Sequence, residues 1–402
     1  MSLLDQLSRR ECWEAFYDYK TSLACPKAFA KELRVFIDGE GYLPVCHRIA
    51  AGEPFPLPRK SVVSKLDGKK KRTVYTYPTA ENTVLKLLTW LLLRRYDGLF
   101  EDNLYSFRPG RTAKDAVRAL RAVPGIRGMW AYKADVSNYF NSIPVERLLP
   151  LLSRVLADDR RLFAFLSALL SELGALSGGE TVTEPKGIMA GTPLSAFYAN
   201  LYLCALDRHF AEKGVPYARY SDDIILFAPD KAGAEALGGE VRAVLEAHGL
   251  TLNPDKEEFF SPAEGWVFLG FHCRGGAVDI APASLQKIKA KMRRKARALA
   301  RWRDRNGYGG EKAAAAFIRV FNRKLLESPA DNELSWKSWY FPLLTTSDSL
   351  RIIDRYAQDC LRFLISGKRT KRRFDVRYED LKRLGYRSLV HEYYAFSDET
   401  GK

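Results

Sequence analysis

The sequence predicts an α+β fold with two or three subdomains, and three observations lead to that expectation. The chain has 402 residues, more than one typical hydrophobic core accommodates. Hydrophobic residues make up 47% and aromatic residues 12%, which is ample for a globular interior. Helical and strand-like segments are mixed along the chain without regular strand–helix alternation, and this mixture favours α+β over a doubly wound parallel sheet.

The first part of the chain predicts a helical segment, a hairpin and a buried helix, in that order. Residues 1–50 contain amphipathic stretches such as "PKAFAKELRVFID". After the Pro-rich "EPFPLPRK", the stretch "SVVSKLDGKKKRTVYTYP" predicts a β-hairpin that turns at Asp67-Gly68. Residues 81–97 include "VLKLLTWLLLRRY", which Lys86 interrupts and which is too short to cross a bilayer, so we expect a buried helix.

The middle of the chain predicts further strands and helices. "RTAKDAVRALRAV" favours a helix, "GMWAYKADV" a strand, and "VERLLPLLSRVL" and "RRLFAFLSALLSELG" two helices. "TPLSAFYANLYLCALDRHF" predicts one long helix, with Thr192 as the cap and Pro193 in the first turn. "YARYSDDIILFA" and "GWVFLGFHCRGGAVDI" each predict a hairpin, with a helix between them. The remainder is expected to be mostly helical and basic.

Charge and cysteine content limit the possible partners and surroundings. The chain carries 64 Lys and Arg against 48 Asp and Glu, a net charge of +16, which favours a polyanionic partner. The N-terminal sequence has no signal-peptide core, and no segment is long and apolar enough for a membrane span. The six cysteines are scattered without a CxxC pair or a Cys/His cluster, which argues against structural zinc and a disulfide scaffold. We therefore expect a reduced, cytoplasmic protein that does not bind a membrane.

Two adjacent carboxylates, Asp222 and Asp223, lie between the strand-like runs "YARY" and "IILFA". A polar hairpin turn is the simpler interpretation, but the apolar flanks hold this tip on a buried sheet, where two carboxylates need a cation. Mg²⁺ prefers oxygen ligands and is commonly bound by one or two carboxylates together with substrate phosphates. Asp135 ends another predicted strand, and with Asp222 it would suit two metal ions roughly 3.5–4 Å apart, the arrangement used in phosphoryl transfer.

Five blocks of the sequence resemble those of bacterial reverse transcriptases of the group II intron, retron and phage-defence types. They are "SFRPGRTAKDAV", "ADVSNYF", "GIMAGTPLSAFYANLYL", "YSDD" and "GLTLNPDKEEFF", and their order and spacing match that family from about Lys65 to Phe271. The resemblance implies a right-hand polymerase with fingers, a palm built on an antiparallel sheet, and a helical thumb. It implies an N-terminal helical extension at 1–58, fingers at 59–128, a palm at 129–275 that includes helices at 145–175, and a basic thumb and C-terminal region at 276–402.

The resemblance also implies roles for single residues of the active site. Asp135, Asp222 and Asp223 match the catalytic, metal-binding aspartates, with two Mg²⁺ ions as cofactors and Mn²⁺ as a substitute. Phe140, five residues after Asp135, matches the aromatic "steric gate" that excludes a 2′-hydroxyl; a core phenylalanine is the alternative. Lys256 matches the lysine that protonates the leaving pyrophosphate, and a surface lysine fits its position as well.

Further residues match nucleotide and template contacts of the family. Lys65 and Arg72 match the binders of the incoming triphosphate, because cations neutralise phosphate charge and arginine grips two oxygens. Arg108 and Arg111 match contacts with the template and the floor of the nucleotide pocket. "FLGF" resembles the primer grip, although an ordinary strand would look the same.

One block departs from the family. Met189-Ala190-Gly191 replaces the usual Pro-Gln-Gly, and Ser195-Ala196 replaces Ser-Pro. The retained Gly191 and Ser195 are expected to let the backbone approach a nucleotide and template base. The missing glutamine puts the template contacts in doubt, and the departure makes the chain most similar to single-gene antiviral defence reverse transcriptases.

The C-terminal third supports binding of nucleic acid. Residues 286–305 contain ten Lys or Arg and one Asp, with apolar residues at helical spacing. We expect a thumb helix in which Lys287, Lys291, Arg294 and Arg301 follow a nucleic-acid backbone. A solvated surface helix is the alternative. A second basic cluster, at 367–389, has aromatic residues between its charges, which suits RNA or an ordinary core equally.

Together these features predict an RNA-directed DNA polymerase that adds dNTPs to a 3′-hydroxyl on a structured noncoding RNA template, makes a DNA product and acts in antiphage defence. Two alternatives stay open. One is a maturase-like RNA-binding protein, against which the three intact aspartates argue. The other is template-independent DNA synthesis, which the missing glutamine favours. An RNA polymerase is disfavoured by Phe140, and no oligomeric state is predicted.

Overall fold

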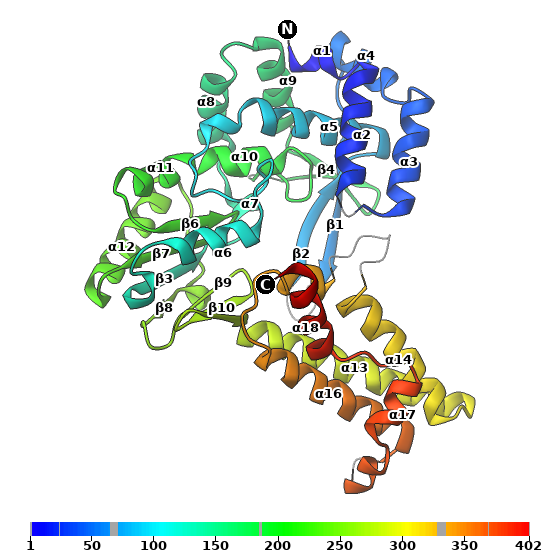
Figure 1. Ribbon diagram of the computed structural model, residues 1–402. Helices are drawn as coiled ribbons and strands as arrows, with labels where there is room; N and C mark the ends of the chain where they lie inside the picture. The colour runs from blue at the N-terminus through cyan, green and yellow to red at the C-terminus, as the bar shows by residue number, and fades with distance from the viewer. Residues whose placement is uncertain are drawn as a thin grey trace. The chain divides into compact units, whose positions relative to one another are not determined.

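The structure is a computed structural model that describes residues 2–23, 25–64, 71–184, 187–327, 335–368 and 370–401. The chain divides into two compact units. Unit 1 consists of Met1–Leu23 and Ala28–Ser261, and unit 2 of Ala24–Lys27 and Pro262–Lys402. Helices and strands are mixed in each unit, so the expected α+β class is confirmed (Figure 1). The boundary at Pro262 lies inside the stretch predicted as palm.

Unit 1 begins with short helices packed around a long apolar one. The N-terminal stretch forms helices, as the sequence predicts: α1 (Leu3–Gln6), α2 (Arg10–Ser22), α3 (Lys27–Asp38) and α4 (Leu43–Ala51). Trp13 is fully buried, donates its indole N–H to the Leu7 carbonyl at 2.7 Å and stacks on Tyr42. The expected buried helix is α5 (Thr79–Arg95), most of whose apolar side chains are inaccessible. Within the described ranges, no helix combines the length and apolarity that a bilayer crossing requires.

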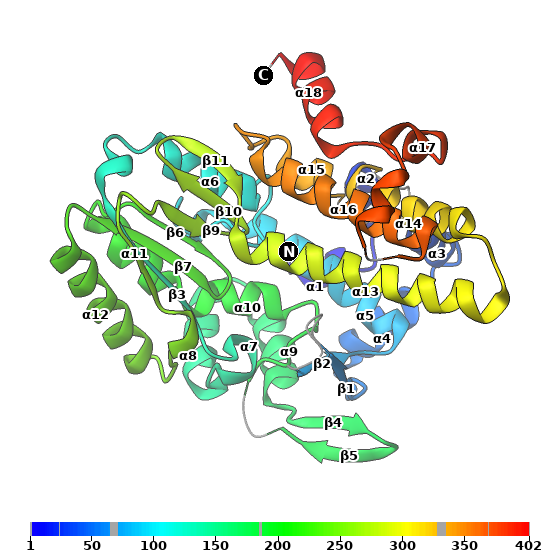
Figure 2. The same ribbon diagram turned by 90° about the horizontal axis from the view of Figure 1, so that it is seen from below.

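A four-stranded sheet in unit 1 has the strand order β2-β1-β4-β5. Its strands are β1 (Arg59–Ser64), β2 (Lys71–Thr76), β4 (Gly174–Ser177) and β5 (Glu180–Thr183). β1 and β2 form the predicted antiparallel hairpin, although its expected Asp67-Gly68 turn lies outside the described residues. The β4–β5 hairpin, which projects in Figure 2, was not expected from the sequence because each strand has only four residues.

The second sheet of unit 1 is antiparallel throughout, with the order β6-β7-β3-β8. It contains β3 (Trp130–Asp135), β6 (Tyr217–Tyr220), β7 (Asp223–Ala228) and β8 (Glu258–Phe260). The two central strands are almost entirely buried, because α12 (Lys231–Ala247) packs against β3 and β7. This sheet fixes the positions of the chain segments that carry the three aspartates.

The remaining helices of unit 1 correct one expectation. They are α6 (Ala113–Ala122), α7 (Tyr139–Ser142), α8 (Val145–Val155), α9 (Arg160–Ser171), α10 (Ser195–Tyr202) and α11 (Cys204–Glu212). The prediction of one long helix from Thr192 is wrong, because the backbone leaves the helical conformation at Leu203 and α11 begins anew. Thr192 does not cap α10 either, since its hydroxyl donates to the Met189 carbonyl at 3.0 Å. The break lets α11 carry Asp207 to a buried arginine described below.

Unit 2 joins a small sheet to a helical bundle. The sheet has the order β11-β10-β9, from β9 (Trp266–Phe268), β10 (Phe271–Arg274) and β11 (Ala277–Ile280), so the predicted hairpin has a third strand. The helices are α13 (Pro282–Asn306), α14 (Gly310–Leu325), α15 (Trp336–Tyr340), α16 (Asp348–Ser366), α17 (Tyr378–Arg383) and α18 (Leu389–Thr400). Helices α13, α14 and α16 pack against one another along their lengths (Figure 1).

Helix α14 begins against the C-terminal end of α16 at Gly310, and this contact yields a stability prediction. A Cβ at Gly310 would lie 2.3 Å from the Ile365 carbonyl oxygen, whereas one at Gly309 would meet nothing within 4 Å. Gly310→Ala should lower the free energy of unfolding by about 1–3 kcal/mol, since the clashing atom is backbone and cannot rotate away. This cost outweighs alanine's helical advantage of about 1 kcal/mol.

The matched control is Gly309→Ala, which should cost about 1 kcal/mol or less because its methyl group enters open space. Thermal unfolding of both variants and the parent tests the contact. Equal melting temperatures for the two variants would contradict the close packing of α14 on α16.

Candidate active site

The three aspartates meet at one edge of the antiparallel sheet. Asp135, the last residue of β3, pairs directly with Asp223, the first residue of β7. Asp222 lies in the two-residue turn that joins Tyr220 to Asp223, and its carbonyl accepts a hydrogen bond from the Val136 amide at 3.1 Å. Directly paired residues of an antiparallel ladder point to the same face. The fold therefore brings the predicted carboxylates together from two strands.

Burial makes this group of carboxylates costly without a cation. Asp135 is only 5% exposed, and Asp222 and Asp223 are half-buried. Burial raises the pKa of Asp222, and the charge of Asp135 raises it further. Burial and the neighbouring charges of Asp222 and Asp135 raise the pKa of Asp223 to about 6. Both shifts show that the site favours the loss of negative charge or the arrival of positive charge.

Lys256 supplies positive charge at this edge. It ends the 3-10 helix η3 (Pro254–Lys256), and its ammonium group forms an ion pair with the Asp135 carboxylate. The segment before it follows the end of β3, where the Asn253 amide donates to the Asp135 carbonyl at 2.8 Å. Lys256 thus lies at the carboxylates, and its side chain stays 45% exposed, so it remains accessible to a substrate.

The residues suit a metal ion whose remaining ligands come from a substrate. Among the residues that the structure describes, no three His, Cys, Asp or Glu side chains are gathered closely enough to hold a metal ion unaided. Mg²⁺ retains waters and is bound by one or two carboxylates plus phosphate oxygens, so a complete protein cage is not required. Asp135 and Asp222 carry the hard oxygen donors that such an ion accepts, and the ammonium group of Lys256 lies beside Asp135.

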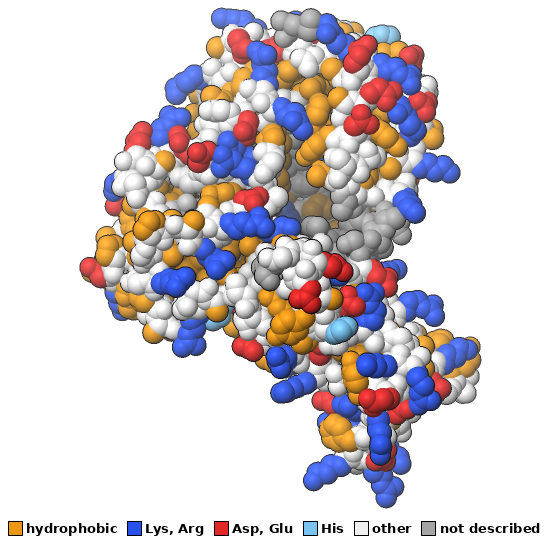
Figure 3. Space-filling view, in the orientation of Figure 1, with side chains coloured by type: hydrophobic (Ala, Val, Ile, Leu, Met, Phe, Trp, Pro, Cys, Tyr) orange, Lys and Arg blue, Asp and Glu red, His pale blue; other side chains and the backbone are white. Residues whose placement is uncertain are grey.

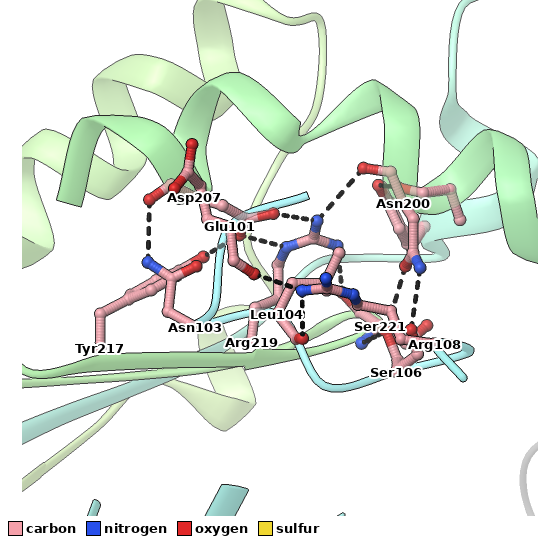
Figure 4. A network of polar contacts seen from close by, with 12 residues as sticks. Glu101, Asn103, Leu104, Ser106, Arg108, Asn200, Asp207, Tyr217, Arg219 and Ser221 are labelled. Atoms are coloured by element: carbon pink, nitrogen blue, oxygen red, sulfur yellow. Dashed lines mark hydrogen bonds and ion pairs between the residues drawn. The ribbon is translucent and has the colours of Figure 1, made fainter. Parts of the chain in front are cut away.

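A buried polar network supports the turn that carries Asp222. Arg219 of β6 is fully buried, and its Nε donates to Asp207 of α11 at 2.7 Å. The same guanidinium donates to the carbonyls of Ser221, at 3.2 Å, and Asn200. The Ser106 hydroxyl accepts a hydrogen bond from the Ser221 amide at 2.9 Å (Figure 4). Both backbone groups of Ser221, the first residue of the turn, are thus hydrogen-bonded to buried side chains.

Sequence reasoning missed this network. The sequence does contain a signal for it. The short apolar strand "YARY" includes a lone arginine, and a buried arginine needs an anionic partner, which an aspartate on the preceding helix can supply. Ser221 has a positive φ of 60°, a conformation that a non-glycine residue keeps only when its surroundings enforce it. The hydrogen bonds to both Ser221 backbone groups provide that enforcement.

The two arginines of "SFRPGR" have different surroundings. Arg108 is buried and donates to the Asp97 carboxylate at 2.8 Å and to the Glu101 carbonyl at 2.6 Å. Its guanidinium therefore supports the loop that contains Ser106, and the expected contact with a template is not available to it in this arrangement. Arg111 pairs with Asp102, which is almost fully exposed, so a template contact for Arg111 stays a prediction.

Phe140 lies at the start of α7 and is half-buried. Its neighbour Tyr139 fills the core, with its hydroxyl bonded to the Ala199 carbonyl. The Phe140 ring meets the edge of Phe107, whose ring centre is 6.5 Å away and which is 40% exposed. Of the neighbours Tyr139 and Phe140, Tyr139 is therefore the one that fills the core. The Phe140 ring stays partly accessible, five residues after Asp135 in the chain.

The Met189-Ala190-Gly191 block lies beneath strand β2. The Tyr75 amide donates to the Ala190 carbonyl at 2.8 Å, and a Cβ at Gly191 would lie 3.1 Å from the Tyr75 carbonyl oxygen. With φ of +101°, Gly191 therefore allows close approach of the β2 backbone, and its expected contact with a nucleotide stays a prediction. Ser195 is also buried, with its hydroxyl bonded to the Thr192 carbonyl at 2.7 Å.

The remaining predicted residues are exposed or lie outside the described part. Arg72 is exposed on β2, opposite Val63. Lys65 falls outside the described residues. In unit 2, four basic residues of α13 are exposed on one face while its apolar residues are buried against α14 and α16. The exposed residues are Lys287, Lys291, Arg294 and Arg301.

One protein family matches more than half of the chain. The profile of the family "Reverse transcriptase (RNA-dependent DNA polymerase)" matches residues 63–273, more than half of the chain. The chain is 24% identical to protein YkfC of Escherichia coli over 261 residues, 55% of this chain and 68% of that protein. It is 26% identical to the group II intron-encoded protein LtrA of Lactococcus lactis over 43% of this chain and 29% of that protein.

Other similarities are more distant. The chain is 29% identical to an uncharacterized 91 kDa protein in the cob intron of Schizosaccharomyces pombe, over 37% of this chain and 18% of that protein. It thus spans less than a third of LtrA and of the yeast protein. Apo telomerase from Candida tropicalis aligns over 56% of this chain and 55% of its own, with 11% identity and a TM-score of 0.46.

The raised pKa of Asp223 yields a prediction for pH dependence. A carboxyl whose folded pKa exceeds its unfolded value binds its proton more tightly in the folded state, so its contribution to stability is present at low pH and lost as pH rises through about 6. In metal-free buffer, Asp223→Asn should therefore be more stable than the parent at pH 7 by on the order of 2 kcal/mol, and this difference should shrink towards pH 4.

Urea unfolding in a chelator across pH 4–7 measures the difference. Asp18→Asn, at an exposed position of α2, controls for the removal of one negative charge from a basic protein. If the free energies of unfolding of the parent and Asp223→Asn changed in parallel with pH, the raised pKa of Asp223 would be contradicted.

Proposed function

The chain belongs to the reverse transcriptase family, and on that premise we propose that it extends a 3′-hydroxyl with dNTPs by two-metal chemistry while copying a structured RNA. The observation that carries the proposal is the pairing of Asp135 with Asp223 at a sheet edge, with Asp222 in the adjoining turn. Burial and the neighbouring negative charges raise the pKa values of Asp222 and Asp223, and a bound cation would relieve this repulsion.

Asp135 and Asp222 would hold the metal ions, and Asp223 would add negative charge behind them. Bound Mg²⁺ would activate the attacking hydroxyl and stabilise the leaving oxygen, and Mn²⁺ could substitute for it. The chain's own contribution is to keep the carboxylates fixed, through the sheet register and the Arg219 network, so that no reorganisation is needed when substrate binds.

Lys256 would act on the leaving group. Its ammonium is paired with Asp135, one of the residues that would hold a metal ion, so it would be within reach of a triphosphate bound there. It lies on a short 3-10 helix with an exposed side chain, so a shift of its long side chain is enough. Its proton would then pass to the pyrophosphate oxygen as the P–O bond breaks.

Phe140 would discriminate between sugars. Its ring is half-buried against Phe107 and Tyr139, which hold it in place, and it follows closely after Asp135. A ring fixed beneath the sugar leaves no room for a 2′-hydroxyl, so deoxynucleotides would be preferred. Arg72, and Lys65 if it follows the family pattern, would bind the triphosphate.

The resemblance also supports an assignment of parts. Under this proposal the β1–β2 hairpin belongs to the fingers, the β6-β7-β3-β8 sheet is the floor of the palm, and α13 is a thumb helix. The exposed face of α13 with Lys287, Lys291, Arg294 and Arg301 would contact phosphates without reading bases. LtrA is named as encoded by a group II intron, and similarity to it supports RNA as the template.

We extend the proposal to antiphage defence in the cell's cytoplasm, on the resemblance of the Met189-Ala190-Gly191 block to single-gene defence enzymes. The block is tied to β2 by the Tyr75–Ala190 hydrogen bond, so its altered sequence lies where fingers and palm elements meet. Loss of phage protection on inactivation of Asp222 in the native host would be the expected result.

The metal ligands are tested by Asp222→Asn and Asp135→Asn. Each should abolish dNTP addition while leaving RNA affinity nearly unchanged, because a neutral amide is a poor ligand for Mg²⁺. Primer extension on an RNA template measures the first property, and filter binding the second. Asp230→Asn, at the cap of α12 away from the sheet edge, is the control and should stay active. Full activity of either active-site variant would overturn the assignment.

The sugar gate is tested by Phe140→Ala. Removal of the ring should raise ribonucleotide incorporation by roughly tenfold or more, with little loss of dNTP use, because only the ribose clashes with it. Phe259→Ala removes an exposed ring of β8 that does not contact Phe140, and it should leave the discrimination at the parent's level. Single-nucleotide incorporation assays decide the point, and unchanged discrimination in Phe140→Ala would show that the ring only packs.

A further inference from the structure

Unit 2 contains a basic pocket that lies outside the residues matched by the family. It has a volume of about 340 Å³ and is formed by α13, α16 and the 3-10 helix η4 (Lys371–Asp375). Three arginines from two of these elements line it together with two aromatic rings and one carboxylate. These residues are Arg293, Arg297, Arg373, Tyr356, Phe363 and Asp359.

The pocket adjoins the face of α13 proposed as a thumb surface. Arg293 and Arg297 are one helical turn apart, on the flank of α13 that meets α16. Arg297 also neighbours Arg294 and Arg301, three and four residues away, so the pocket borders the row formed by Lys287, Lys291, Arg294 and Arg301.

The interior of the pocket is organised around Tyr356. Arg293 lies beside it in the lining of the pocket, and Lys289 is 5.3 Å from the centre of its ring. Burial raises the pKa of Tyr356, and the charges of Arg293 and Arg297 act against that rise. Two guanidinium groups therefore line the pocket together with one aromatic residue, and an anion bound between them would reduce their mutual repulsion.

The rim of the pocket combines arginine with a further aromatic ring. Phe374 of η4 is 52% exposed, and the guanidinium groups of Arg373 and Arg362 lie over its ring at 4.7 and 5.4 Å. Asp359 is 3.8 Å from Arg373, so one carboxylate offsets part of the charge and leaves an excess of two positive charges among the lining residues. A wider basic hollow, lined by Lys368, Thr370, Lys371 and Arg372, begins at the same 3-10 helix.

We propose that this pocket binds one nucleotide of a single-stranded RNA segment, with the phosphate between Arg293 and Arg297 and the base against Tyr356 or Phe363. The volume is at the lower end of ligand pockets, which suits one nucleotide and excludes a duplex. Guanidinium groups grip phosphate oxygens in pairs, and aromatic rings stack on any base. Asp359 offers an acceptor to a 2′-hydroxyl. Figure 3 shows Lys and Arg side chains crowding this end of unit 2, at the bottom of the view.

The proposal does not depend on the catalytic aspartates, so it is tested in the Asp222→Asn background, where no synthesis alters the RNA. The probe is a fluorescent 12-nucleotide oligouridylate, with an RNA duplex of equal length as a second ligand. Arg293→Gln combined with Arg297→Gln should weaken oligouridylate binding by about tenfold or more. Duplex affinity should change less than about threefold.

The slope of log affinity against log salt for the single strand should also fall by about 0.7, the value for one lost phosphate contact. Arg319→Gln combined with Arg383→Gln removes two exposed arginines of unit 2 that do not line the pocket, and should reproduce neither effect. Circular dichroism checks folding, and Arg297→Gln alone serves if the double variant unfolds.

A second measurement locates the base. Crosslinking with 4-thiouridine in the oligonucleotide, followed by peptide mapping, should mark the α16 segment that contains Tyr356 and Phe363. Equal losses for the single strand and the duplex would overturn the proposal, because the pocket arginines would then act only as surface charge. Binding of a polyglutamate peptide that is lost in the pocket variant, with RNA affinity unchanged, would assign the pocket to an acidic protein segment and overturn it as well.

Discussion

The buried ion pair between Arg219 and Asp207 is the interaction on which the arrangement of the active site depends. Neither side chain is accessible, and the pair joins strand β6 to helix α11. Loss of one partner of such a pair costs roughly 3–5 kcal/mol, because the other charge is left buried. The remaining guanidinium hydrogens bond the carbonyls of Ser221 and Asn200, so the same pair that joins the elements also shapes the turn before Asp222.

The electrostatic character of the site follows from this support of the turn by Arg219. The turn is held rigidly enough that Asp222 and Asp223 stay near Asp135, although all three are negative and at least partly buried. Lys256 offsets the charge at Asp135, while the pKa values of Asp222 and Asp223 remain raised. A divalent ion relieves this repulsion more fully than one ammonium group. The support of the turn and the raised pKa values of its carboxylates are thus two consequences of one arrangement.

The sequence predicted the strands and helices that carry the aspartates because their signals are local. Apolar runs before Asp135 and on both sides of Asp222 identify strands, and the adjacent carboxylates identify the turn. The break at Leu203 has no comparable local signal, since the whole stretch from Ser195 to Glu212 is apolar or helix-forming. The position of this break depends on a tertiary contact, the one between Asp207 of α11 and Arg219.

The site was predicted less completely than the fold, for a similar reason. Arg108 has the residue type and position of a template contact, but its burial against Asp97 depends on a loop that sequence spacing does not describe. Gly191 was expected to face a nucleotide, while the backbone that approaches it belongs to β2. In this part of unit 2 the sequence predicted only a basic cluster with aromatic residues between its charges. It did not predict a pocket, because the lining residues come from α13, α16 and η4, which lie far apart in the chain.

The most direct test of the account is the anomalous scattering of Mn²⁺ in crystals of the protein with an RNA template, a DNA primer and an incoming dNTP that cannot react. The account predicts two peaks roughly 3.5–4 Å apart, located at the carboxylates of Asp135 and Asp222. Peaks at other carboxylates, with Asp135 still paired to Lys256 in a complex that extends primers when given dNTPs, would contradict it.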